Sequence, residues 1–273
     1  MSDGTQNMDV VSHIVSGLPV TSPLKTLFLG GSRGRGTEDG YSDFDFIAVC
    51  EPQQNESVAH DWHTILEELE PLIYWQKLGK QSMLINAITK SWIRIDLSMV
   101  PALEKSNFSK DMLVPVLDPD DLLSALPAKS KRRKTKPDAV LSIVNEFIRI
   151  MGLTGVVIGR REHLVGVWGV QHLRNQLIAL MLEEVNPLHR GGALLLNPLL
   201  TDEQRFALGA LPSAVATRNS VIQVNLAYAK VFLPRARALV ERTGAQWPDE
   251  FERETWAYLS RELEMDVGSV LVP

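Results

Sequence analysis

The sequence predicts an α+β protein in two parts, a small mixed β-sheet flanked by helices and then an all-α helical bundle. Short apolar or alternating runs typical of strands fall within residues 27–100. Few helical segments separate these runs, which favours a mixed sheet over a doubly wound one. Beyond Pro137 the apolar residues recur at helical spacing. We therefore expect a sheet domain over residues 1–127, a basic linker over 128–137 and a helical domain over 138–273.

The elements of the first part follow from the apolar pattern and from the Gly and Pro residues between the runs. They are, in order, a helix over 8–18, strands over 27–29 and 43–49, a helix over 58–69, and strands over 72–76, 82–89 and 92–100. In the last strand, Trp92, Arg94 and Asp96 alternate with apolar residues and share one face. Because a mid-strand aspartate is unfavourable unless its face lines a cleft, we expect Asp96 to face one.

The second part is predicted to contain helices over 140–151, 164–185, 201–208, 214–243 and 249–263. The helix over 164–185 carries apolar residues on most sides and is expected to be central to the bundle. Its His172 is more typical of a hydrogen-bonded core residue than of a cleft residue. Glu183 and Glu184, near its end, either attract a cationic ligand or simply face water.

The basic segment between the two parts differs sharply from its surroundings. Residues 129–136 contain six Lys or Arg residues and lie between Pro127 and Pro137. A solvated interdomain linker explains this composition most simply. The same side chains could instead contact the phosphates of a bound nucleotide. A nucleic-acid patch is disfavoured because the rest of the chain is acidic.

The stretch between the first two predicted strands carries the main functional signal. Four glycines fall within residues 30–36, which allows the backbone to approach a ligand closely. Asp43 and Asp45 follow, and because strand side chains alternate, both carboxylates lie on one face while Phe44 lies on the other. Hard divalent cations such as magnesium prefer carboxylate and phosphate oxygens. A glycine-rich turn beside paired carboxylates therefore indicates nucleotide chemistry.

Two common phosphate-binding motifs are excluded here. A P-loop requires a lysine near the end of the turn, where Gly36 and Thr37 stand. A dinucleotide fingerprint requires a third glycine at the position of Asp39.

The pattern Gly31-Ser32, Arg35-Gly36 and Ser42-Asp43-Phe44-Asp45 resembles the signature of the DNA polymerase beta type nucleotidyltransferases. Within that superfamily it is most similar to the enzymes that adenylylate aminoglycoside and lincosamide antibiotics. The stretch Arg94-Ile95-Asp96-Leu97 resembles the strand that brings a third acidic residue to their site. A nucleotidyltransferase domain followed by a helical, substrate-binding domain is also their plan, although no motif of the helical half matches.

The resemblance implies the roles of individual residues. Asp43 and Asp45 would bind magnesium, and Asp96 would either complete the metal site or act as the catalytic base. Gly31, Ser32 and Arg33 would hold the terminal phosphates of ATP or another nucleoside triphosphate, chiefly through Ser32 and the backbone amides.

Arg35 would contact the same phosphates or, alternatively, pair with Glu38 or Asp39. The implied reaction is transfer of AMP to a hydroxyl group, with release of pyrophosphate.

Composition narrows the partners and the location. A net charge of -5 argues against a general nucleic-acid binder and suits a multicationic acceptor such as an aminoglycoside. A lone Cys50 excludes an intramolecular disulfide. We expect no signal peptide, because residues 1–11 carry Asp3 and Asp9 and lack a basic start and an apolar core. We expect no membrane contact, because no apolar run approaches the roughly 20 residues required to span a bilayer, so the expected location is the cytoplasm.

The expected function is therefore antibiotic resistance by adenylylation of an aminoglycoside-type molecule. Two alternatives stay open at this point. One is a lincosamide nucleotidyltransferase. The other is a nucleotidyltransferase-fold protein that acts on a protein partner, as in toxin-antitoxin systems, although those relatives usually lack a helical half.

Overall fold

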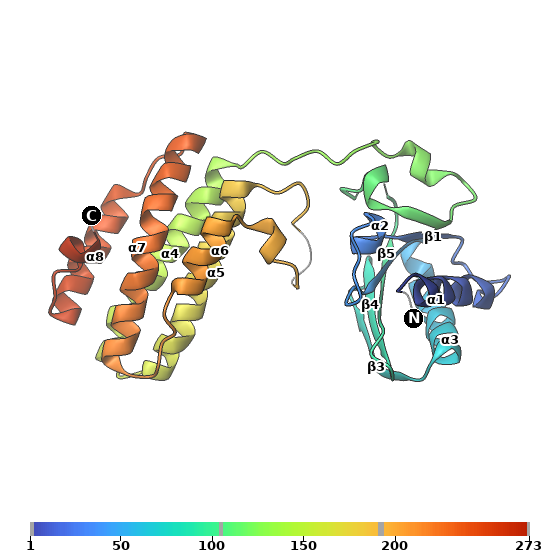
Figure 1. The fold of residues 1–273 in the computed structure, drawn as a ribbon, viewed down its shortest axis with the longest axis horizontal. Coiled ribbons are helices and arrows are strands. Elements are labelled where there is room, and N and C mark those ends of the chain that lie inside the picture. Colours follow the sequence, from blue (N-terminus) through green and yellow to red (C-terminus); the bar gives the residue numbers. More distant parts are fainter. Residues whose placement is uncertain (1–2, 104–105, 191–193, 272–273) are drawn as a thin grey trace. The chain divides into compact units, whose positions relative to one another are not determined.

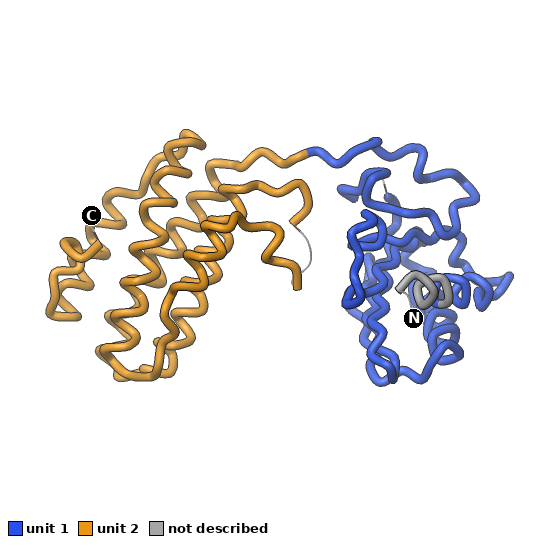
Figure 2. The backbone as a smooth tube through the Cα atoms, in the orientation of Figure 1, with its two compact units in different colours: residues 1–131 blue, residues 132–273 orange. Residues whose placement is uncertain are grey.

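The computed structural model describes residues 3–103, 106–190 and 194–271. The chain divides into two compact units, residues 1–131 and 132–273 (Figures 1 and 2). The first unit contains the sheet and the second is helical, so the predicted α+β class is confirmed. The boundary between the units falls inside the basic segment, whereas a separate linker over 128–137 stays a prediction.

The first unit alternates helices and strands in an order close to that expected. Its elements are α1 (Asp3–Gly17), β1 (Thr26–Leu29), α2 (Gly31–Gly34), β2 (Phe44–Val49), α3 (Asn55–Leu69), β3 (Leu72–Leu78), β4 (Met83–Thr89), β5 (Arg94–Val100) and β6 (Val114–Leu117), with short 3-10 turns at Pro52–Gln54, Lys110–Met112 and Leu122–Ala125. The six strands form one mixed sheet in the order β3-β4-β5-β2-β1-β6. Only β2 and β5 pair in parallel, and the other four pairs are antiparallel.

The two faces of the sheet are covered differently. On one face, Phe46 of β2 packs in the main core of the unit with residues of α1 and α3, and its ring meets the edge of Trp62 at 5.2 Å between centroids. On the other face, Ile47 of β2 and Phe28 of β1 form a smaller cluster with three leucines from the segment that follows β5. Because side chains alternate along β2, Phe46 lies in the main core, whereas Asp45 and Ile47 lie on the less covered face.

The second unit is a bundle built mainly from three long helices. Its elements are α4 (Pro137–Gly159), α5 (His163–Val185), a 3-10 turn at Asn197–Leu199, α6 (Asp202–Ala210), α7 (Arg218–Thr243), α8 (Asp249–Leu263) and α9 (Val267–Leu271). Phe147 of α4 stacks on Phe232 of α7, with ring centroids 3.7 Å apart. In α5, Leu173, Leu177 and Leu180 are fully buried, in agreement with a central place in the bundle.

Helix α4 extends well beyond the predicted range of 140–151. Glycines interrupt the apolar pattern after residue 151, yet they serve close helix packing and do not end the helix. A Cβ at Gly155 would lie 2.9 Å from the ring of Tyr258 in α8, so only glycine allows this approach.

Helix α4 is also the one helix of the described residues that is long and apolar enough to cross a membrane by length and composition. The core helix of a soluble protein meets the same criteria, so the expectation of no membrane contact stays a prediction. About 44% of its apolar window is buried inside the structure, where α4 packs against other helices of the bundle.

Three further details differ from the sequence prediction. The loop after β1 opens with the one-turn helix α2, whose Gly34 amide donates to the Gly30 carbonyl at 2.6 Å. Strand β5 begins at Arg94, because Trp92 has a φ of 66° in the turn from β4. Strand β6 was not among the predicted strands; it is four residues long, contains Pro115 and pairs with β1 through an irregular register.

Trp62 should be essential to the core of the first unit. The residue is 0% exposed, so Trp62→Ala should lower the free energy of unfolding of this unit by about 3–5 kcal/mol. Trp92, which is 69% exposed, offers a matched control, and Trp92→Ala should shift stability by no more than about 0.5 kcal/mol. Urea titration followed by circular dichroism measures both, and equal effects would contradict this assignment of the core.

Candidate active site

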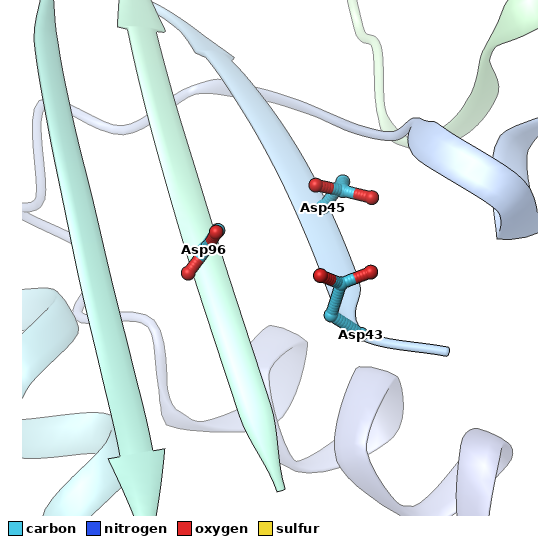
Figure 3. A group of neighbouring side chains, drawn as sticks. All are labelled: Asp43, Asp45 and Asp96. Carbon is cyan, nitrogen blue, oxygen red and sulfur yellow. The ribbon is translucent and has the colours of Figure 1, made fainter. Parts of the chain in front are cut away.

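The parallel pairing of β2 with β5 brings two acidic residues together. In this register Asp45 stands directly opposite Asp96. Asp43, one step before β2 begins, lies on the same side (Figure 3). Each of the three residues offers a carboxylate oxygen, and these oxygens all lie within 4.8 Å of one another. The carboxylates predicted from separate stretches of sequence thus form one cluster on the less covered face of the sheet.

Arg33 holds the chain that leads into β2. Its side chain is buried, with Nε donating to the Asp43 carbonyl at 2.9 Å and Nη2 to the Ser42 carbonyl at 3.0 Å. The guanidinium also lies 4.0 Å from the centre of the Phe44 ring. The side chain of Arg33 therefore positions Asp43, and only its backbone amide remains suited to the phosphate role that the resemblance implies.

Arg94 also meets Asp43. A guanidinium nitrogen lies 3.5 Å from Asp43 Oδ2, and another donates to the Tyr41 carbonyl. Asp96 lies two residues along β5 and faces Asn86 of β4 across the antiparallel pair. Although Arg94 and Asp96 share one face of β5, the ion pair of Arg94 is with Asp43.

The glycine-rich turn fits closely against the carboxylates. Gly31 has a φ of 59°, and a Cβ placed there would lie 1.7 Å from Asp45 Oδ2. Gly34 meets the carbonyl of Met112, which a Cβ would approach to 2.2 Å. The backbone at Gly31 can therefore lie against Asp45 only because it carries no side chain.

The cluster raises the pKa of two of its members. Burial raises the pKa of Asp45 to about 6, and the charges of Asp43 and Asp96 add to the shift, while Arg35 and Arg94 oppose it. The pKa of Asp96 is also raised, first by burial and then by Asp43, against a hydrogen bond from Asn86. Asp45 and Asp96 thus resist ionisation because water is partly excluded from them and their neighbours are negative.

A divalent cation fits this arrangement. The ligand atoms are carboxylate oxygens only, which is the donor set that magnesium prefers. A cation among them would relieve the repulsion that raises the pKa of Asp45 and Asp96. Asp43, Asp45 and Asp96 are therefore the residues that could hold a metal, and among the described residues no second group of three such ligands comes as close.

The remaining predicted site residues lie around this cluster. The Ser32 carbonyl accepts hydrogen bonds from the Thr37 amide at 2.9 Å and the Arg35 amide at 3.2 Å, which tightens the turn after α2. Arg35 is close enough to lower the pKa of Asp45 by its charge. Asp39, which was considered as a partner of Arg35, accepts a hydrogen bond from Ser42 Oγ on its Oδ1. The phosphate-binding roles of Ser32 and Arg35 stay predictions.

One residue of the basic segment has a structural role that the sequence did not reveal. Arg133 Nη2 lies 2.7 Å from Glu183 Oε1, and Arg190 Nη2 lies 2.6 Å from the same oxygen. Glu183 is 3% exposed, and Glu184 pairs with Arg235 at 3.0 Å. Both glutamates are thus bound within the helical unit and do not simply face water, and Arg133 anchors the segment to α5.

Removing one charge from the cluster should stabilise the metal-free protein. Because the folded-state pKa of Asp45 is about 6 against an ordinary value of 3.8, the wild type loses stability as pH rises through this interval. Asp45→Asn does not lose stability in this way. The difference between its melting temperature and that of the wild type should therefore increase from pH 4 to pH 6 and then remain constant. Thermal melts in chelator across pH measure it.

Asp43→Asn is the control for this prediction, since it also removes a negative charge but breaks the contact with Arg94. Its gain should be smaller. A pH-independent difference between Asp45→Asn and wild type would contradict the raised pKa.

Comparison with known proteins gives similarity at the level of fold. No family model and no curated protein matches the chain. Among solved structures it is similar to an aminoglycoside 6-adenyltransferase from Bacillus subtilis, with a TM-score of 0.43 and 14% identity over 96% of this chain and 99% of that one. It is also similar to a cytoplasmic RNA terminal U-transferase, with a TM-score of 0.29 and 13% identity over 84% of this chain and 66% of that one. Both of these proteins belong to the nucleotidyltransferase superfamily, whose signature the sequence motif resembles.

Proposed function

We propose that this protein is a magnesium-dependent nucleotidyltransferase. It moves a nucleoside monophosphate, AMP from ATP in the first instance, to a hydroxyl of a small molecule and releases pyrophosphate. The observation that carries this proposal is the cluster of Asp43, Asp45 and Asp96 packed against the glycine-rich turn at Gly31. Carboxylate oxygens beside a glycine-rich turn, whose backbone a phosphate can approach closely, suit a metal-bound triphosphate.

The chemistry follows from this placement. Magnesium would neutralise the negative charge that develops on the phosphate oxygens. Asp43 and Asp45 would hold it, and the backbone amides of the glycine-rich turn would receive the terminal phosphates. The acceptor oxygen forms a bond to the α-phosphorus as the bond to the pyrophosphate oxygen breaks. Asp96 is within reach of the same centre and, with its raised pKa, either takes the proton from the acceptor hydroxyl or serves as a third ligand.

For the acceptor we favour a multicationic aminoglycoside over a lincosamide. The chain has a net charge of -5, which attracts a polycation more than a singly charged molecule. Modification of such a molecule would give antibiotic resistance, in the cytoplasm where ATP is available. Nucleic-acid acceptors fit an acidic chain poorly.

The proposal is tested by incubating the full chain with labelled ATP, magnesium and a panel of aminoglycosides and lincosamides, with product masses recorded. The expected result is an adduct of one AMP on an aminoglycoside, and none in chelator. A panel of the other nucleoside triphosphates decides the preferred nucleotide. AMP on a protein in cell extract with no small-molecule product would instead favour the toxin-antitoxin alternative.

The glycines of the turn offer a matched pair of variants. Gly31 and Gly36 both have positive φ, so alanine at either costs about 1–2 kcal/mol of backbone strain. Only the Gly31 Cβ meets Asp45, whereas nothing lies within 4 Å of a Cβ at Gly36. Gly31→Ala should therefore weaken magnesium-dependent ATP binding at least about tenfold, since a displaced carboxylate costs more than 1.4 kcal/mol.

Gly36→Ala should bind ATP and magnesium within a few-fold of wild type. Calorimetric titration of both variants, with and without chelator, measures the difference. If the two variants weaken binding equally, the close fit of Gly31 against Asp45 is not part of the site.

Asp96→Asn distinguishes the two roles of this residue. If Asp96 is the base, the variant should bind magnesium and ATP almost normally and lose about 10²–10⁴-fold in turnover, partly recovered at high pH. Asp43→Asn should lose metal-dependent ATP binding as well as turnover, which makes it the reference for a ligand. Turnover across pH and ATP affinity are measured with one acceptor. Full activity in Asp96→Asn would exclude the site as drawn.

A further inference from the structure

The helical unit contains a cavity of its own, which the proposed reaction does not use. It has a volume of about 240 Å³ and lies between α4, α5 and α7. Its apolar walls include Leu153 and Val157 of α4 and Val165 and Trp168 of α5. All of the residues that line it belong to the second unit, so this site is complete within one compact body.

Large apolar side chains at the cavity remain exposed. Trp168 is 65% exposed, Val165 44% and Leu153 42%. The sequence predicted a core position for His172, but this residue is exposed and its ring lies 5.1 Å from that of Trp168. A tryptophan and a histidine held at the mouth of an apolar cavity, and not packed into the core, offer flat surfaces to an aromatic ligand.

A buried polar atom in the wall points to a hydrogen-bonding ligand. Asn225 of α7 is 4% exposed, and its Nδ2 donates to Thr154 Oγ1 at 2.6 Å. Its Oδ1 is buried and has no hydrogen-bond partner. Both residues line the cavity. Because an unsatisfied buried acceptor costs free energy, a ligand in the cavity whose N–H or O–H group reaches Oδ1 after a rotation of the Asn225 amide gains what the free protein lacks.

The charges at the cavity cancel each other. Glu146 and Arg149 of α4 form a two-pronged ion pair, with both nitrogen-oxygen distances at 2.7 Å. No net charge is left to attract an ion, and the apolar walls would exclude a polycation. The cavity therefore suits a neutral molecule and differs in kind from the acceptor favoured for the carboxylate cluster.

We propose that this cavity binds a small neutral aromatic molecule that donates a hydrogen bond to Asn225. Its size agrees with such a ligand, because an engineered apolar cavity of about 150 Å³ holds benzene, and 240 Å³ leaves room for a second fused ring. Indole is the probe of choice, since it has two fused rings and one N–H donor. Indole has no hydroxyl, so its binding does not depend on nucleotidyl transfer.

The first test is calorimetric titration of the full chain with indole and with benzofuran, which has the same shape but an oxygen in place of the N–H group. We expect saturable binding of one indole per chain and about tenfold weaker binding of benzofuran. Equal affinity for the two would overturn the hydrogen bond to Asn225. No binding of indole would overturn the site.

The second test blocks the cavity. Gly169 of α5 lines it, and a Cβ there would meet nothing within 4 Å, so Gly169→Leu adds a side chain at the cavity whose first atom has no clash. Gly209 of α6 is equally open but lies outside the cavity, which makes Gly209→Leu the matched control. Both changes raise helix propensity, so both variants should fold. Loss of indole binding in Gly169→Leu alone supports the proposal, and loss in both or neither overturns it.

The third test removes an aromatic wall. Trp168→Ala should weaken indole binding about tenfold, whereas Trp92→Ala, at a tryptophan of similar exposure in the other unit, should not. Asp45→Asn should bind indole like the wild type, because it changes only the carboxylate cluster. An effect of Asp45→Asn as large as that of Trp168→Ala would assign indole to the nucleotide site instead.

Discussion

The parallel pairing of β2 with β5 sets two aspartates side by side, and like charges on neighbouring strands destabilise a sheet. The surroundings of this pair reduce the cost without removing it. Arg94 contacts Asp43, Asn86 donates to Asp96, and the backbone at Gly31 lies against Asp45 where a side chain would not fit. A sheet that keeps so unfavourable a pair in register trades stability for a site, as natural proteins do where chemistry requires it.

The two units use charge in opposite ways. In the sheet unit three carboxylates remain uncompensated enough to raise the pKa of two of them. In the helical unit the acidic residues of interest are already paired: Glu183 with two arginines, Glu184 with Arg235 and Glu146 with Arg149. Attraction of a cation is therefore concentrated in the sheet unit, while the helical unit provides apolar surface. This division separates the forces that would bind a nucleotide from those that would bind a neutral ring.

Local patterns in the sequence were sufficient to single out the three aspartates and to predict most of the helices and strands. The spacing of Asp43 and Asp45 and the alternation around Asp96 predicted three residues on the less covered faces of two strands, and their meeting depended on a pairing that no local pattern encodes. The pairing of Arg133 with Glu183 was not predictable, because it joins residues 50 positions apart in the chain. The burial of Arg33 depends on how the turn after α2 folds back on residues 42–44, which no local pattern encodes. The cavity beside Trp168 was missed since a helical pattern counts apolar residues and does not show which of them lack a neighbour.

The order of the strands leaves the sheet with two unlike borders. At one end, β6 carries Pro115, which has no amide hydrogen to donate and so discourages another strand from pairing there. At the other end, β3 pairs with β4 alone and exposes Ile73, Tyr74 and Leu78, with Lys77 as its principal charge. Under crowded or partly denaturing conditions, self-association of the first unit should therefore begin at β3, and solubility would be improved by substitutions on this strand before any other.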